Sequence, residues 1–179
     1  TMIEGVLILA ERPVRSIMTP STEVTWLDLE EDQATLRQRV METGHTAYPV
    51  CRGTLDNLVG VALSRDLVRD LLEKGEINLS TIEQKPLIVP DGTSVLRAVG
   101  QIRQSVVQMA IVTDEFGAIE GVVTPTDILE AIVGELPDQR EEALDPKEQP
   151  DGSLLVDAAI DIHRLSQVLG IDLVDGAVG

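Results

Sequence analysis

The chain contains the same unit twice. Residues 60–68 read GVALSRDLV and residues 121–129 read GVVTPTDIL, so a glycine, small apolar residues and an aspartate recur 61 residues apart. Upstream, residues 48–51 (YPVC) align with residues 109–112 (MAIV) without a gap. A small unit that cannot bury its apolar face alone needs a neighbour, so repeats are expected to pack on each other. The duplication therefore predicts a pseudo-twofold pair of half-domains with a cleft between them, where we look for function.

Composition limits what such a pair can bind. The 179 residues suffice for one compact domain or two half-domains with a real core. Because 43% of the residues are hydrophobic and only 2% are aromatic, the core must be aliphatic, and no aromatic platform for stacking bases is available. The net charge of −17 would repel a phosphate backbone, so we expect no nucleic-acid partner. The acidic surface is expected to be solvated, with divalent-cation binding as the alternative.

Other kinds of site have little support. Cys51 is the only cysteine and aligns with Val112, so a buried apolar role is favoured over a nucleophile, and the lack of disulfides fits a reducing compartment. His45 and His163 lie far apart, which argues against a transition-metal site. No apolar run approaches the ~20 residues of a membrane span. The start at Thr1 lacks a signal peptide, and we expect the sequence to be a piece of a longer protein.

Hydrophobic periodicity and turn residues predict each repeat as β-α-β-β-α, in an α+β fold of the α/β-sandwich type. Gly44 and Gly75 are placed to end helices. The expected elements, in order, are a helix over 2–10, a turn over 14–20, a strand over 23–28, a helix from 32, strands over 47–51 and 58–63, a helix over 64–74, a strand over 87–89, a helix over 93–104, strands over 108–113 and 118–123, and a helix over 125–134.

Domain boundaries follow from this pattern and from charge. We expect a linker helix over 1–15, a first repeat over 16–76 and a second repeat over 77–136. An acidic linker over 137–150 would then lead to a short segment over 151–179. That last segment is too short to be a domain by itself.

The residues best suited to bind a ligand are Thr124, Pro125, Thr126 and Asp127, at a strand end where a helix begins. Threonine at the N-cap, proline at the first helical position and an acid at the third make a capping box, and helix capping alone would account for all of them. The same geometry offers free N–H groups and the positive end of the helix dipole to a phosphate. An aspartate at this position can also accept both hydroxyls of a ribose.

The two units resemble CBS domains, and together they resemble a Bateman module. More specifically, the chain resembles the CorC/HlyC (hemolysin-like, CNNM) family over roughly residues 2–174. The motifs that carry this likeness are MIEGV (2–6), RSIMTP (15–20), GHT (44–46), YPV (48–50), LDNLVGV (55–61), DEFG (114–117), GVVTPTDILE (121–130) and DGSLLVD (151–157), the last of which is similar to the opening of a transporter-associated C-terminal domain.

The resemblance implies a regulatory role. In that family the CBS pair lies on the cytoplasmic face of the inner membrane, attached to a membrane domain linked to magnesium and cobalt efflux. The pair itself would be soluble and would dimerise as a flat disc. Related proteins carry the same pair behind a TerC-type membrane domain, and the fragment does not separate the two.

The resemblance also implies an adenine nucleotide ligand, either ATP with Mg²⁺ or AMP. By position, Asp127 would hold the ribose, and Thr124, Thr126 and the adjoining Pro125 would lie at the ribose or phosphates. The base would be flanked by Ile88, Val89, Met109 and Ala110, with His45, Thr46 and Ala47 bordering the cleft. No catalytic residues and no protein-held metal are expected.

Departures from the family pattern lead to further expectations. Leu63 replaces the threonine in the first repeat although Asp66 remains, so the first site should be weak or empty. Ser21 and Ala47 stand where relatives often have arginine, so nucleotide affinity should be low, or AMP should be favoured over ATP. The alternative is a structural dimerisation platform whose nucleotide site has decayed. A hydrolase is disfavoured because the sequence offers no activated nucleophile or paired general base near Thr124.

Overall fold

A computed structural model describes residues 2–135 of the chain. Residue 1 and residues 136–179 lie outside the described residues, and so do the predicted acidic linker over 137–150, the segment over 151–179 and His163.

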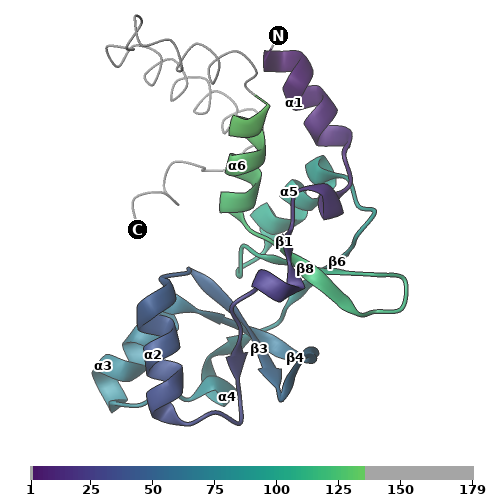
Figure 1. The fold of residues 1–179 in the computed structure, drawn as a ribbon. Coiled ribbons are helices and arrows are strands. Elements are labelled where there is room, and N and C mark those ends of the chain that lie inside the picture. The colour runs from purple at the N-terminus through teal and green to yellow at the C-terminus, as the bar shows by residue number, and fades with distance from the viewer. Residues whose placement is uncertain (1, 136–179) are drawn as a thin grey trace, which may run out of the picture.

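Two four-stranded sheets, each with helices packed on it, make up the described chain (Figure 1). Both halves follow the predicted order β-α-β-β-α, which confirms the tandem fold. The first half consists of β2 (Leu27–Asp28), α2 (Gln33–Thr43), β3 (Ala47–Arg52), β4 (Thr54–Leu63) and α3 (Ser64–Lys74). The second half consists of β6 (Leu87–Pro90), α5 (Val95–Gln104), β7 (Ala110–Thr113), β8 (Ile119–Val123) and α6 (Pro125–Gly134).

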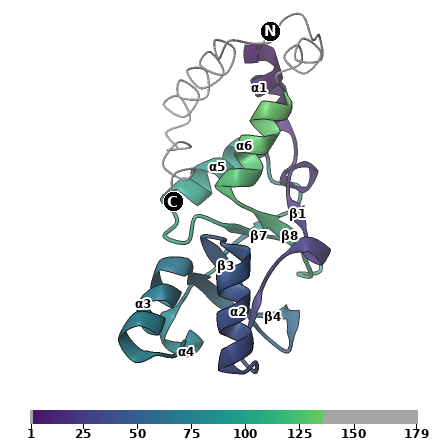
Figure 2. The ribbon, with the colours of Figure 1, turned by 60° about the vertical axis from the view of Figure 1, so that its left-hand side comes forward.

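The remaining elements precede or join the two halves. They are α1 (Met2–Glu11), the 3₁₀ turns η1 (Val14–Ser16) and η2 (Ser21–Glu23), β1 (Thr19–Pro20), α4 (Leu79–Ile82) and β5 (Glu83–Gln84). Helix α1 lies beside α5 and α6 of the second half, not against the first half that follows it in sequence (Figure 2). An ion pair of 2.9 Å between Arg12 and Glu135 joins the end of α1 to the residue after α6.

Each sheet gains an edge strand from a segment outside its own half. Strand β1 precedes the first half, yet it pairs antiparallel with β8 of the second, in the sheet order β1-β8-β7-β6. Strand β5 follows the first half and pairs with β4, in the order β2-β3-β4-β5. Because the sheets cross the boundaries expected at residues 16–76 and 77–136, those boundaries stay predictions.

This exchange of edge strands explains the repeated glycine. A Cβ atom at Gly121 would overlap the carbonyl oxygen of Thr19 in β1 and lie 3.0 Å from the sulfur of Met18. At the equivalent Gly60, a Cβ atom would lie 2.8 Å from the carbonyl oxygen of Gln84 in β5. Real Cβ atoms do not approach backbone so closely, so only glycine allows each borrowed strand to pair here.

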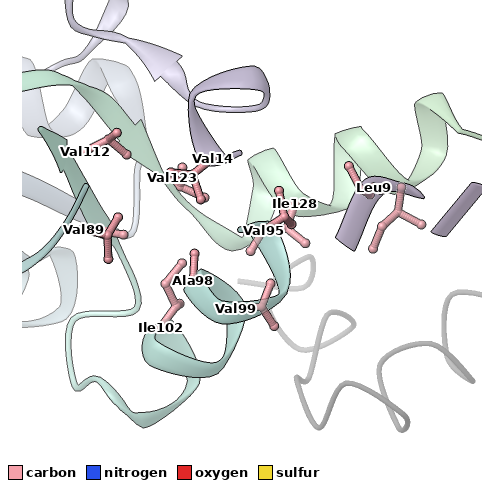
Figure 3. Close-up of a cluster of buried hydrophobic side chains, with 12 residues drawn as sticks. Leu9, Val14, Val89, Val95, Ala98, Val99, Ile102, Val112, Val123 and Ile128 are labelled. Atoms are coloured by element: carbon pink, nitrogen blue, oxygen red, sulfur yellow. The ribbon is translucent and has the colours of Figure 1, made fainter. Parts of the chain in front are cut away.

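Three aliphatic clusters form the core. The first fills the second half and includes Leu9 of α1 and Val14 (Figure 3). The second fills the first half around Tyr48 and Leu67, which are fully buried. The third joins the two sheets and holds the halves together; its members are Ala47, Val61, Leu63, Val107, Met109, Ile111 and Val122.

Element boundaries differ from the sequence-based expectation in two places that matter for the cleft. The strand predicted over 23–28 is reduced to β2 at 27–28, because η2 turns the chain directly after β1. The strand predicted over 108–113 begins only at Ala110, because Gln108 has a positive φ of 48° that interrupts the extended chain.

Candidate functional site

A pocket of about 360 Å³ lies between the two halves and takes its walls from both. The start of α6, strand β1 and the loop that leads into β3 all contribute to its lining. The residues predicted from sequence that line it are His45, Thr46, Ala47, Met109, Thr124, Thr126 and Asp127. The cleft expected from the duplication is therefore present, and it is open.

The first turn of α6 fixes Asp127 in the lining of the pocket. Thr124 is the N-cap in extended conformation (φ −116°), and Pro125 occupies the first helical position. The Asp127 carboxylate oxygen Oδ2 accepts hydrogen bonds from the Thr124 backbone N–H at 2.9 Å and from its hydroxyl at 3.0 Å. The Asp127 N–H donates in turn to the Thr124 hydroxyl at 3.3 Å, which completes the capping box.

The second oxygen of Asp127 is engaged by a residue from the far end of the chain. The Thr19 hydroxyl donates to Oδ1 at 2.7 Å, and strand β1 carries Thr19 to this position by pairing with β8. The sequence pattern predicts Thr19 in a turn and indicates no role for it in the site. The only sequence signal was the repeated glycine at position 121, which indicates a close backbone approach without naming the segment that makes it.

Part of the pocket lining is apolar and adjoins a fixed loop. Ala47, Pro49 and Met109 form this apolar wall, and all three are buried. The loop before β3 is held by the hydroxyl of Tyr48, which accepts from the His45 N–H at 3.1 Å and contacts the Thr43 hydroxyl at 2.8 Å. Because the tyrosine ring is fully buried, this contact anchors the backbone of residues 43–47 to the core of the first half.

The pocket is acidic. Glu23, Asp127 and Glu130 contribute carboxylates, and no lysine or arginine is among the described residues that line it. The start of α6 supplies few free donors, because Pro125 has no N–H and the Asp127 N–H is already bonded to Thr124. The Ile128 N–H donates to the Thr124 carbonyl oxygen. Among residues 125–128, only the Thr126 N–H is therefore left as a free backbone donor.

Four predicted residues do not line the pocket. Val89 and Ala110 are fully buried in the core of the second half, and Ile88 is 53% exposed on β6, at the sheet edge opposite β1. Pro125 lies at the start of α6 outside the lining. A ligand-binding role for these four residues stays a prediction. Glu23, Gln108 and Glu130 line the pocket instead and were not predicted.

The equivalent residues of the first half are arranged differently. Leu63 makes no side-chain cap at the start of α3 and is buried in the cluster between the sheets. Asp66, the counterpart of Asp127, forms an ion pair with Arg69 at 3.3 Å, where the second half has Glu130. The first turns of α3 and α6 therefore differ both in the hydrogen bonds around the aspartate and in the charge three residues later.

The described chain shows no second site at its cysteine or among metal-ligating side chains. Burial raises the pKa of the Cys51 thiol to about 12, with smaller contributions from the charges of Asp28 and Asp56. The thiol is buried, in agreement with its expected apolar role. Residues 2–135 hold no cluster of histidine, cysteine or carboxylate side chains suited to a metal ion. Within the same range, no helix has the length and apolarity required to cross a bilayer.

The chain matches a known domain family and curated membrane proteins. The CBS domain family model matches residues 14–73 and 77–134. Among curated relatives, the UPF0053 inner membrane protein YoaE of Escherichia coli K12 is 37% identical over 172 residues, which cover 96% of this chain and 33% of the relative. The chain thus spans about a third of the length of this relative and of several others.

Two solved structures are informative neighbours. The CBS domain of a bacterial CNNM/CorC family Mg²⁺ transporter in complex with ATP is 37% identical, with a TM-score of 0.66 over 75% of this chain and 96% of that one. A CBS-domain pair from Klebsiella pneumoniae with bound AMP is 28% identical, with a TM-score of 0.60 over 69% of this chain and 99% of that one.

Proposed function

Because this chain belongs to the CBS domain family and carries two such domains in tandem, we propose that it senses an adenine nucleotide and regulates a membrane transport domain attached to it. The observation that carries the proposal is the Asp127 carboxylate, which faces a pocket of about 360 Å³ and is already held by hydroxyl and N–H donors. No catalytic role is part of the proposal.

The hydrogen bonds around Asp127 indicate where a ribose would bind. A carboxylate oxygen accepts about two hydrogen bonds, so the whole group has roughly four acceptor positions. Oδ2 already accepts two, from the N–H and hydroxyl of Thr124, whereas Oδ1 accepts one, from Thr19. The free position is on Oδ1, so a ribose hydroxyl would share that oxygen with Thr19. Thr124, whose proton is committed to Asp127, would then act by orienting the carboxylate.

The apolar wall of the pocket suits a purine. Ala47, Pro49 and Met109 offer an apolar surface against which a base could pack while its ribose bonds to Asp127. Neighbouring CBS structures were obtained with ATP or with AMP bound, which supports an adenine nucleotide as the ligand class.

The acidic lining bears on how many phosphates can be tolerated. Glu23, Asp127 and Glu130 would repel a metal-free triphosphate, and Ser21 and Ala47 contribute no cation. A monophosphate carries less charge, and a divalent cation would neutralise much of the charge of a triphosphate. We therefore propose AMP, or ATP with Mg²⁺, as the ligand, and metal-free ATP as the weakest binder.

Transmission of the signal is proposed to run through β1. Thr19 contacts the ribose-binding oxygen and belongs to the segment that connects α1 to the first half. A ligand shifts a conformational equilibrium only if it binds two states with different affinity. Because Thr19 would share Oδ1 with the ribose hydroxyl, a state in which β1 carries Thr19 away would leave the carboxylate differently oriented and would bind the ligand with a different affinity. We propose that the pair acts as a homodimer on the cytoplasmic face of the inner membrane, attached to a Mg²⁺ or Co²⁺ transport domain, with a TerC-type membrane domain as the alternative.

Isothermal titration of the chain with AMP, ADP and ATP, each with and without Mg²⁺, tests the proposal. Asp127→Ala should abolish detectable binding, because it removes the ribose acceptor and leaves Thr19 and Thr124 without their partner. Asp66→Ala is the matched control, since it makes the same change at the repeat-related position and should alter affinity little. Equal losses in both variants would contradict the assignment of the site, and absence of heat with every nucleotide would contradict the function.

The second candidate is a structural platform whose nucleotide site has decayed. Its support is the lack of any lysine or arginine among the described pocket residues. It predicts a dimer in size-exclusion chromatography that no nucleotide alters, and a melting temperature that is the same with and without millimolar AMP.

A further inference from the structure

One residue of the pocket has an unusual backbone conformation. Gln108 has φ 48°, and it is the only non-glycine residue with positive φ in the described part of the chain. Glycine, asparagine and aspartate adopt this region with less strain than glutamine, whose side chain gains nothing from a local hydrogen bond there. Its counterpart in the first repeat, Ala47, is extended within β3, so the strain is not required by the repeat itself.

Packing on both sides holds the strained residue in place. Val107 and Met109 are 2% and 4% exposed and belong to the cluster that joins the two sheets. Anchored by these neighbours, Gln108 is exposed and lines the pocket. Its amide makes no hydrogen bond with the described residues. A strained conformation that presents an unpaired polar group to a pocket is typical of a functional position.

We propose that Gln108 selects the base of the nucleotide by binding the amino edge of adenine. The inference rests on the proposed nucleotide site and specifies its base preference. A glutamine amide presents one acceptor and one donor side by side, which match the 6-amino group and N7 of adenine. In hypoxanthine or guanine a carbonyl replaces the 6-amino group, so this edge presents two acceptors, and the amide can donate to only one of them in either orientation. Gln108 and Met109 are adjacent and both line the pocket, so we expect the amide to reach a base packed against Met109.

The test compares AMP with IMP, which carry the same ribose and phosphate and differ at position 6 of the base. The unmodified chain should bind AMP at least about tenfold more tightly than IMP, the discrimination that one bidentate amide contact provides. Gln108→Gly removes the amide and keeps a backbone suited to positive φ. This variant should lose about tenfold in AMP affinity, and its AMP-to-IMP ratio should approach one.

Two further measurements separate this role from a structural one. The melting temperature of the ligand-free Gln108→Gly variant should be no lower than that of the unmodified chain, because glycine relieves the strain. Gln104→Gly is the matched control, since Gln104 ends α5 and does not line the pocket, and it should leave both affinities unchanged.

The outcomes are distinguishable. If Gln108→Gly binds AMP with the original affinity and retains the original AMP-to-IMP ratio, the role of Gln108 is refuted while the nucleotide site stands. If neither AMP nor IMP binds the unmodified chain at millimolar concentration, the proposed function fails and the inference falls with it.

Discussion

Replacing Gly121 by alanine should separate strand β1 from the site that it completes. The new Cβ atom would overlap the Thr19 carbonyl oxygen and lie 3.0 Å from the Met18 sulfur. Backbone cannot yield as a flexible side chain can, so β1 must move off β8. That movement takes the Thr19 hydroxyl away from Asp127 Oδ1, to which it now donates at 2.7 Å.

The expected loss in the free energy of unfolding follows from the interactions that β1 makes. A hydrogen bond to a charged group is worth about 1.5–3 kcal/mol. Adding the disturbed pairing of a two-residue strand, we expect Gly121→Ala to lower the free energy of unfolding by about 2–4 kcal/mol. For a chain of 179 residues each kcal/mol corresponds to about 2–4 °C, so the melting temperature should fall by roughly 4–16 °C.

The repeat supplies the control. Gly60→Ala makes the same change where a Cβ atom would lie 2.8 Å from the Gln84 carbonyl oxygen, and β5 does not reach the pocket. Gly100→Ala, in α5 with no atom within 4 Å, should instead stabilise the chain by roughly 0.5–1 kcal/mol. Thermal unfolding and AMP titration of all three variants form the assay. We expect Gly60→Ala to lose stability but keep its AMP affinity, and Gly121→Ala to lose both.

Two results would refute this reasoning. If Gly121→Ala is as stable as the unmodified chain, β1 does not depend on close approach to β8. If it is destabilised but binds AMP normally, Thr19 does not support the ligand-binding carboxylate.

Three further expectations concern single titratable groups. Because burial raises the pKa of the Cys51 thiol to about 12, a thiol-specific reagent at about pH 8 should label the chain only after unfolding; rapid labelling of the folded chain would contradict this. A hydrogen bond with Asp91 raises the pKa of Glu120 in the folded chain above its usual value of 4.5. Protonated Glu120 therefore stabilises the folded chain fully below pH 4.5, and this stabilisation is lost as the pH rises through the raised pKa. Glu120→Gln should therefore raise the melting temperature more at about pH 7 than at about pH 4, and equal shifts at the two values would count against it. Glu130→Gln should strengthen binding of metal-free ATP several-fold and that of AMP less, because one repelling carboxylate is removed; the reverse order would disagree with the electrostatic argument.

The duplication made most of the fold predictable. Apolar periodicity and the glycines at helix ends placed α3 at residues 64–74 with Gly75 as its cap, as the structure has it. The capping box at Thr124 and Asp127 was also predicted, because its residue types and spacing are local and specific. Features of this kind depend on neighbours within a few residues, so the sequence contains the information directly.

The exchanged strands could not be predicted in the same way. Strands β1 and β5 have two residues each, which is too short for any alternation of polar and apolar side chains. Their partners lie about a hundred residues away for β1 and about twenty for β5, so no local pattern connects them. Thr19 was missed for this reason, although it makes the shortest hydrogen bond to Asp127.

Gln108 was missed for a different physical reason. Its position in an apolar run predicted a continuous strand, and glutamine carries no tendency toward positive φ. The conformation results from burial of Val107 and Met109 in the cluster between the sheets, which is a tertiary effect. Local preference was overridden at a pocket residue, and such positions are where sequence reasoning is expected to fail.

A crystal structure of the chain grown with AMP would test the central claim most directly. We predict AMP between the two halves, with a ribose hydroxyl bonded to Asp127 Oδ1 beside the Thr19 hydroxyl and with the base against Met109. AMP bound instead at Asp66 of the first half, or a pocket at Asp127 that stays empty at saturating AMP, would contradict the account.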